Sequence, residues 1–222
     1  MVYDYYQQNL SAERLRKAYE IAPPRVQQYL KAEIDFVLSR IKPSDRVLEL
    51  GCGYGRVLPE LANRAKVVAG IDNALPSLKL ARGITASNIQ LAAMNAADTA
   101  FADQAFDLVV CLQNGISAFH VDPVQMVREN LRLTKIGGRV LISSYSDKFW
   151  GDRLEWFELQ AGKGLLGLID YDATGDGIIA CKDGFRATTY TVKDFELLLK
   201  GFAVEYSMHE VDQSSLFCEI IA

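Results

Sequence analysis

The chain has 222 residues, of which 50% are hydrophobic and 23% are charged, and its formal net charge is −4. This composition is typical of an ordered globular protein, and the mild negative charge favours neither a nucleic-acid partner nor an anionic membrane surface. No apolar run approaches the roughly 20 residues of a membrane span and the first residues do not resemble a signal peptide, so we expect a cytoplasmic protein.

The first 45 residues are predicted to form a helical cap. Ser11 can begin a helix that runs to about Ile21, ahead of the consecutive prolines at positions 23 and 24. Apolar residues spaced by about 3.6 positions predict a second helix from Val26 to Ile41.

Residues 46–144 alternate between short apolar runs and helical stretches. The runs predict five strands, at residues 47–50, 67–71, 89–91, 106–111 and 139–143. Strands that are apolar throughout and separated by helices indicate a parallel sheet covered on both faces. We therefore expect a Rossmann-like, doubly wound α/β fold, and this segment forms its core.

The last third of the chain departs from this alternation. Residues 145–190 are expected to be an insertion that covers the sheet, within which Asp183-Gly184 joins two apolar runs and predicts a hairpin. In residues 191–222, Thr191 is expected to cap a closing helix. Strands at 202–211 and 216–221 are then close enough in sequence to form an antiparallel hairpin. We expect one domain with a seven-stranded, mostly parallel sheet whose last strand is antiparallel.

The four cysteines are Cys52, Cys111, Cys181 and Cys218, and they are widely spaced, without a CxxC pair. The two histidines are not clustered. Reduced structural thiols and no metal site are therefore expected.

A glycine-rich stretch, Glu49-Leu50-Gly51-Cys52-Gly53-Tyr54-Gly55, lies between the first strand and a helix. Glycines allow a sharp turn and let backbone N–H groups approach a ligand closely. A phosphate-binding loop would end in Gly-Lys-Ser/Thr, which is absent. The dinucleotide fingerprint would need a glycine where Arg56 stands. The pattern indicates a small-molecule site of another kind.

Two carboxylates follow on the next strands. Asp72 ends the second strand, where it could accept both hydrogen bonds of a ribose diol, as an adenosine-like ligand across the strand tips would require. Asp98 follows the third strand and could accept from an exocyclic amine.

These residues resemble the class I S-adenosylmethionine-dependent methyltransferases. Residues 49–55 are similar to the first motif of that family, Gly70-Ile71-Asp72 to its second and Ala97-Asp98 to its third. The closing helix and hairpin resemble its usual ending. After the fourth strand the chain reads Leu112-Gln113-Asn114-Gly115, not the Asn/Asp-Pro-Pro-Tyr of many amino-group methylases of DNA and protein, which argues against those substrates.

The resemblance implies that S-adenosylmethionine is the cofactor. Asp72 would hold its ribose, Asp98 its adenine amine, and the glycine loop its methionine portion. The full set of expected cofactor contacts is Glu49, Gly51, Cys52, Gly53, Tyr54, Gly55, Asp72, Asn73, Ala97, Asp98 and Gln113.

Catalytic and substrate residues are less determined. His120 could be a general base or an ordinary hydrogen-bonded histidine, and Asn114 is the second catalytic candidate. Aromatic residues near the start, at positions 3, 5 and 6, could fold over the cofactor or anchor the terminus, and Tyr54 could also face the sulfonium. The candidate substrate contacts are Tyr6, Tyr145, Trp150, Arg153, Trp156 and Arg186; those of the insertion could instead form a small core, and the arginines could be solvated.

The expected function is methyl transfer from S-adenosylmethionine to a small-molecule acceptor by in-line displacement. The alternatives are a nicotinamide-dependent oxidoreductase on a similar sheet, a non-catalytic adenosyl-binding module and, disfavoured by charge and motif, a macromolecular methylase. The acceptor and the oligomeric state are not determined by the sequence.

Overall fold

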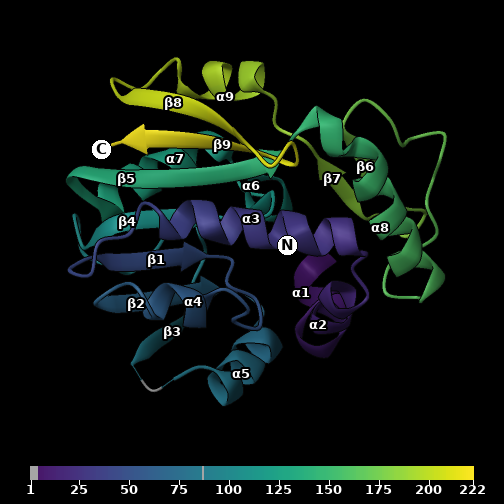
Figure 1. Ribbon diagram of the computed structural model, residues 1–222, viewed down its shortest axis with the longest axis horizontal. Coiled ribbons are helices and arrows are strands. Elements are labelled where there is room, and N and C mark those ends of the chain that lie inside the picture. Colours follow the sequence, from purple (N-terminus) through teal and green to yellow (C-terminus); the bar gives the residue numbers. More distant parts are fainter. Residues whose placement is uncertain (1–4, 87) are drawn as a thin grey trace.

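A computed structural model describes residues 5–86 and 88–222, so Tyr3, one of the aromatic candidates, lies outside the described residues. A seven-stranded sheet with the order β3-β2-β1-β4-β5-β9-β8 forms the centre (Figure 1). The five parallel strands are β1 (Arg46–Leu50), β2 (Val67–Asp72), β3 (Ile89–Ala93), β4 (Phe106–Cys111) and β5 (Thr134–Tyr145). At the other edge, β9 (Ser215–Ile221) is antiparallel to both β5 and β8 (Glu205–Val211). The predicted fold class is confirmed.

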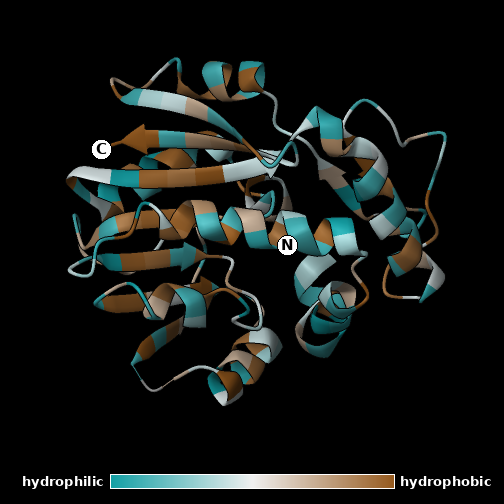
Figure 2. Cartoon of the chain, viewed as in Figure 1, coloured by the Kyte–Doolittle hydropathy of each residue, from teal (hydrophilic) through white to brown (hydrophobic). Residues whose placement is uncertain are grey.

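Helices cover both faces of the sheet because successive strand residues point to opposite faces. On one face, Val47 and Val68 pack with α3 (Pro24–Leu38), α4 (Leu58–Ala62) and α5 (Leu75–Ile84). On the other face, Leu48 and Ala69 pack with α6 (Gly115–Ala118), α7 (Pro123–Leu133) and α9 (Val192–Leu199). Figure 2 shows hydrophobic residues along the middle of β5 and along β9, and bands of both kinds along the helices.

A third hydrophobic cluster lies beyond the carboxyl ends of the parallel strands. It joins the amino-terminal helices α1 (Tyr5–Asn9) and α2 (Ala12–Glu20) to the insertion after β5. The insertion contains a 3-10 turn, η1 (Asp147–Phe149), a helix, α8 (Trp150–Gly162), and a hairpin of β6 (Ile178–Ala180) and β7 (Arg186–Thr188). Figure 1 shows these elements gathered on the side toward which β1 points. This cluster therefore forms a cover over one end of the sheet.

Most predicted elements occur close to their expected bounds, and Thr191 and Asp194 form a complete capping box at the start of α9. The helix α8 was not expected, because glycines at positions 151 and 162 interrupt its pattern and its buried side chains do not follow one apolar stripe. The short helices α1 and α6 were also missed. All four cysteines are buried and unpaired. Among the described residues, no helix has the length and apolar character needed to cross a membrane.

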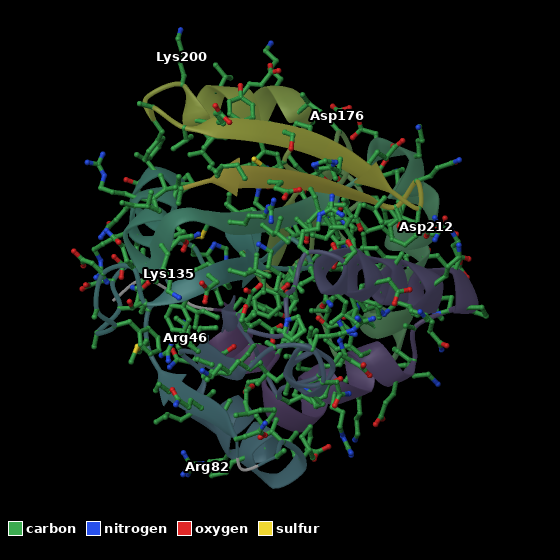
Figure 3. All side chains as sticks on the ribbon, turned by 60° about the vertical axis from the view of Figure 1, so that its left-hand side comes forward. Arg46, Arg82, Lys135, Asp176, Lys200 and Asp212 are labelled. Atoms are coloured by element: carbon green, nitrogen blue, oxygen red, sulfur yellow. The ribbon has the colours of Figure 1, made fainter. Side chains whose placement is uncertain are left out.

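The amino-end edge of the sheet is built from charged side chains. Asp107 accepts hydrogen bonds from Lys135 Nζ at 2.7 Å and from the backbone N–H of Arg46 at 2.9 Å. Figure 3 shows Arg46 and Lys135 close together on this side, well away from Asp212 in the β8–β9 turn. These two hydrogen bonds join the amino ends of β1, β4 and β5 to one another.

Candidate functional site

The main cavity lies at the carboxyl ends of β1, β2 and β4 and has a volume of about 380 Å³. Its walls come from the glycine loop after β1, the residues that follow β2, β3 and β4, and the helices α1 and α2. Ligands of open α/β sheets bind at this edge, where neighbouring crossovers leave in opposite directions. The cavity is therefore the candidate functional site.

The glycine loop forms the floor of the cavity. Gly51 and Gly53 have φ angles of +68° and +53°, which are strained for other residues. A Cβ at Gly51 would lie 2.4 Å from the Phe119 ring, and one at Gly53 would lie 2.9 Å from Leu15 Cδ2 on α2. The positive φ therefore favours glycine at both positions, and at Gly51 the Phe119 ring would also have to move to admit a Cβ. Gly55, also predicted as a contact, packs instead against Ala81 of α5 and does not line the cavity.

Asp72 stands at the end of β2 beside this loop. One of its carboxylate oxygens accepts from the Gly53 N–H at 2.9 Å, and the other accepts from the Ala74 N–H at 2.7 Å. Asp72 is half-buried and lines the cavity together with its exposed neighbour Asn73. The two backbone bonds hold the carboxylate in one orientation at the cavity wall.

Two further ionisable side chains, Glu49 and Arg56, line the cavity on the side of β1. Glu49 is 4% exposed, and its Oε2 atom has no hydrogen-bond partner among the described residues. Burial raises the pKa of Glu49 to about 8, with Arg56 opposing the rise and Asp72 adding to it. The Arg56 guanidinium lies 4.8 Å from the centre of the Tyr19 ring, and its buried Nη2 atom also has no partner among the described residues. A buried carboxyl group and a guanidinium group, each with one buried atom that has no hydrogen-bond partner among the described residues, therefore line the cavity.

The turn after β4 contributes Gln113, a predicted contact that does line the cavity. Its backbone N–H donates to Ser143 Oγ at 2.8 Å, and its side-chain oxygen accepts a hydrogen bond from the Tyr19 hydroxyl on α2. Tyr19 and Arg56 were not identified from the sequence as site residues. Arg56 drew notice in the sequence only because it occupies the position of the third glycine of the dinucleotide-binding fingerprint. Nothing in the sequence indicates that α2 reaches the turn after β4.

The cavity lining includes about half of the predicted site residues. Those that line it are Glu49, Gly51, Cys52, Gly53, Tyr54, Asp72, Asn73, Gln113, His120 and Tyr6. His120 is exposed and adopts a left-handed φ of +50°. Its position at the cavity wall is compatible with a role toward a substrate.

The segment after β3 is placed differently from the expectation. Ala97 and the exposed Asp98 do not line the cavity, whereas Asn95 and Ala96 do. Asn95 and Asp98 form an isolated antiparallel bridge, and the Asn95 side-chain oxygen accepts from the Ala97 N–H at 2.9 Å. The tight turn points Asp98 outward, so the polar side chain at the cavity is an amide and not the expected carboxylate.

Asn114, the second catalytic candidate, is 3% exposed and does not line the cavity. Its Nδ2 donates to the carbonyl of Thr188 at 3.0 Å, and its Oδ1 accepts from Ser144 Oγ at 2.8 Å. Both ends of the amide are therefore used to tie the turn after β4 to the insertion.

The predicted substrate contacts of the insertion lie behind the cavity wall. Arg153 is 1% exposed and donates to Thr189 Oγ1 at 2.6 Å and to the carbonyls of Gly177 and Ala187, both at 3.1 Å. Its guanidinium also lies 4.2 Å from the centre of the Tyr145 ring. Trp156, Trp150 and the exposed Arg186 are likewise absent from the cavity lining, as is Tyr145. The Arg153 contacts hold the insertion together, and Trp156 joins it to α2, because its Nε1 donates to the Ala18 carbonyl at 2.9 Å.

The strand order and the site at the tips of β1, β2 and β4 define a Rossmann-like methyltransferase fold. Residues 47–138 match a family model described as a methyltransferase domain, and this segment contains the motifs that resemble those of the class I S-adenosylmethionine-dependent methyltransferases. S-adenosylmethionine is the methyl donor of this family.

The chain is similar over about 105 residues to two curated proteins. One is a demethylmenaquinone methyltransferase of Corynebacterium kroppenstedtii, 32% identical over 47% of this chain and 44% of that protein. The other is a ubiquinone biosynthesis O-methyltransferase of Paracidovorax citrulli, 34% identical over 45% of this chain and 43% of that protein. The matched part thus spans less than half the length of either relative.

A solved structure of a SAM-dependent methyltransferase from Aquifex aeolicus has the same fold. It superposes with a TM-score of 0.62 over 93% of this chain and 98% of that one, at 15% sequence identity. The likeness in fold therefore extends well beyond residues 47–138.

Proposed function

We propose that this chain binds S-adenosylmethionine in the cavity at the tips of β1, β2 and β4 and transfers its methyl group to a small-molecule acceptor. The observation that supports this best is the pairing of the glycine loop with Asp72. A carboxylate fixed beside a loop without side chains offers a ribose diol two acceptor atoms at close range.

The other polar groups of the cavity fit the rest of that cofactor. Asn95 stands where an adenine edge could donate to an amide oxygen. Glu49 and Arg56, each with an unpaired buried atom, are suited to the ammonium and carboxylate groups of the methionine portion. Buried polar atoms without partners are costly, and a zwitterionic ligand would satisfy both.

Bound S-adenosylmethionine supplies a methyl group already activated on a sulfonium centre. The residues of this chain then have to orient the acceptor and exclude water, and orientation alone can lower a barrier by about 7–11 kcal/mol. Tyr6, Tyr19 and Tyr54 line the cavity, and aromatic faces near a sulfonium attract it by about 0.5–2 kcal/mol. His120 is the candidate base for an acceptor that must lose a proton first.

The names of the two curated relatives support a small acceptor, because both act in quinone metabolism. The walls contributed by α1 and α2 are mainly apolar and aromatic, with Leu10 and Leu15 beside the tyrosines. Such walls suit a partly apolar molecule of small size.

Calorimetric titration with S-adenosylhomocysteine, compared with NADH, tests the cofactor assignment. We expect micromolar binding of S-adenosylhomocysteine and none of NADH; the reverse result would identify a nicotinamide-dependent enzyme instead. Incubation with methyl-labelled S-adenosylmethionine and fractionated small metabolites then tests the reaction. Tight cofactor binding without any labelled product would favour a non-catalytic adenosyl-binding module.

A further inference from the structure

One side chain of the turn after β4 is directed away from the cavity. Leu112, Gln113 and Gly115 all line the cavity. Asn114 lies between them in the chain but does not line it, and is only 3% exposed. A polar side chain is buried at little cost only where its donors and acceptors have partners, so the partners of Asn114 show what it holds in place.

The Asn114 amide joins the turn to two other segments. Its Oδ1 atom accepts from Ser144 Oγ on β5 at 2.8 Å, and its Nδ2 atom donates to the carbonyl of Thr188 at the end of β7 at 3.0 Å. Ser144 Oγ also accepts from the backbone N–H of Tyr190 at 2.8 Å. A single side chain therefore links the turn to the central sheet and to the insertion.

The backbone of this turn needs such support. Gln113 and Asn114 are consecutive non-glycine residues with left-handed φ angles of +52° and +60°. Such residues persist only where the surrounding structure over-determines them. The register between β4 and β5 ends at Cys111, ahead of the turn. Beyond that point two serines of β5 hold the turn through their side chains: Ser143 Oγ accepts from the Gln113 N–H at 2.8 Å, and Ser144 binds Asn114.

The turn determines where Gln113 lies and, through Gln113, where Tyr19 lies. The Tyr19 hydroxyl, on α2, donates a hydrogen bond to the side-chain oxygen of Gln113. Both residues line the cavity, and the Arg56 guanidinium lies 4.8 Å from the centre of the Tyr19 ring. A shift of the turn would therefore move both an amide and an aromatic ring of the cavity wall.

We propose that Asn114 is a positioning residue, whose amide fixes the left-handed turn after β4 and thereby places Gln113 and Tyr19 against the bound cofactor. This inference rests on the proposed cofactor site. Asn114 does not line the cavity, so it acts through Gln113 and not on the reacting atoms. The insertion becomes part of the cofactor site in this way, because Thr188 supplies one of the two partners of the amide.

The test measures S-adenosylhomocysteine affinity by calorimetry for the wild type, Asn114→Gly, Tyr19→Phe and the double variant Asn114→Gly/Tyr19→Phe. Glycine adopts a left-handed φ without strain, so Asn114→Gly removes the two hydrogen bonds and leaves the backbone conformation accessible. We expect each single variant to weaken binding about fivefold or more. The double variant should be little weaker than either, because residues that act through one another are not additive.

Ser117 provides a matched control. Its side chain bonds the same insertion residue from a different element, α6, since its Oγ atom accepts from the backbone N–H of Thr188 at 2.9 Å. Ser117 does not line the cavity. Ser117→Ala therefore removes a comparable hydrogen bond to the insertion while the Asn114 amide keeps both partners, and the affinity should be almost unchanged.

A change in the partner of the amide keeps the inference testable if Asn114→Gly does not fold. Ser144→Ala leaves Asn114 in place and removes the bond to its Oδ1 atom. It should weaken S-adenosylhomocysteine binding in the same direction as Asn114→Gly, and its loss should likewise not multiply with that of Tyr19→Phe.

Unchanged affinity in folded Asn114→Gly or in Ser144→Ala would overturn the inference. Losses that multiply in the double variant would do so too, because the effect would then not pass through Tyr19. An equal loss in Ser117→Ala would show that general attachment of the insertion matters, and not the turn. A wild-type protein that does not bind S-adenosylhomocysteine would instead reject the proposed function, and the inference with it.

Discussion

The backbone N–H of Gly53 donates a 2.9 Å hydrogen bond to the carboxylate of Asp72, which joins the loop after β1 to the tip of β2. Gly53 follows β1 and Asp72 ends β2, and these neighbouring parallel strands have their carboxyl ends at the same edge of the sheet. This hydrogen bond holds the glycine loop next to the Asp72 carboxylate. In the proposed site, the loop lies close to the ligand and the carboxylate binds its hydroxyl groups.

Replacement of Asp72 should remove most cofactor affinity. Hydrogen bonds to a charged group contribute about 1.5–3 kcal/mol each, so Asp72→Ala should weaken S-adenosylhomocysteine binding by more than about tenfold. Asp98→Ala is the matched control, since Asp98 is exposed and outside the cavity. Calorimetry measures both. A loss in Asp98→Ala as large as in Asp72→Ala would show that the adenosine lies elsewhere.

A methyl group at position 51 should block the site. Gly51 and Gly164 have almost the same left-handed φ, +68° and +67°, but a Cβ at Gly51 would meet the Phe119 ring at 2.4 Å, whereas one at Gly164 would meet nothing within 4 Å. Both alanine variants carry the conformational cost of positive φ, about 1 kcal/mol. Only Gly51→Ala should also lose cofactor binding, as measured by the thermal shift with S-adenosylhomocysteine. Equal behaviour of the two variants would contradict the close packing of the loop against Phe119.

Arg153 should matter for stability more than Arg186. Arg153 is buried and its guanidinium holds two carbonyls and Thr189, so Arg153→Ala leaves these groups unsatisfied and should lower the free energy of unfolding by at least about 2 kcal/mol. Arg186 is exposed, and Arg186→Ala should change the free energy of unfolding by less than about 0.5 kcal/mol. Urea denaturation measures both values. Similar small effects would indicate that the insertion does not depend on this guanidinium.

Stability should fall as the pH rises from about 5 to about 8 because of Glu33 and Glu49. Burial raises the pKa of Glu33 to about 7 and that of Glu49 to about 8, above the value of about 4.3 for an unfolded chain. In this window the folded protein retains protons that the unfolded chain has released, so each deprotonation opposes folding. The pKa of Glu129 is lowered to about 2, mainly by its hydrogen bond with Arg132. Its stabilising effect on the fold is therefore fully present throughout this window and does not change the slope of stability against pH.

Melting temperatures across this pH range, for the wild type and Glu33→Gln, check the expected slope. The variant should show a smaller decline, because one of the two titrating groups is removed. The groups that face Glu33 are Tyr29 on its own helix, Arg56 after β1, Cys111 on β4, Tyr145 on β5 and Tyr19 on α2. Burial raises the pKa of each of the tyrosines and of Cys111, so none of these four groups titrates in the same range. Identical slopes in both proteins would contradict the assignment to Glu33.

The part of the site that could be predicted is local in sequence. Residues 49–55 form one turn and Asp72 ends the next strand, so their spacing along a strand-helix-strand unit brings them together whatever surrounds them. Whether residue 95 or residue 98 lines the cavity is decided by a tight turn, and periodicity carries no information inside a turn; the role of Asp98 toward a cofactor stays a prediction. The same limit applies to Asn114, whose type suggested chemistry but whose amide bonds Ser144 and Thr188 outside the cavity lining.

By itself, the sequence determined the sheet, the covering of both its faces and the loop that faces the ligand. Strand and helix periodicities, glycines and the carboxylate at a strand end are all properties of short segments. Only the tertiary structure decided that α2 lies over the glycine loop, so that Tyr19 meets Gln113, and that Glu33 of α3 accepts a hydrogen bond from Ser215 of β9. Contacts between residues 94 and 182 positions apart depend on how the covering helices pack over the sheet, and no local pattern encodes that packing.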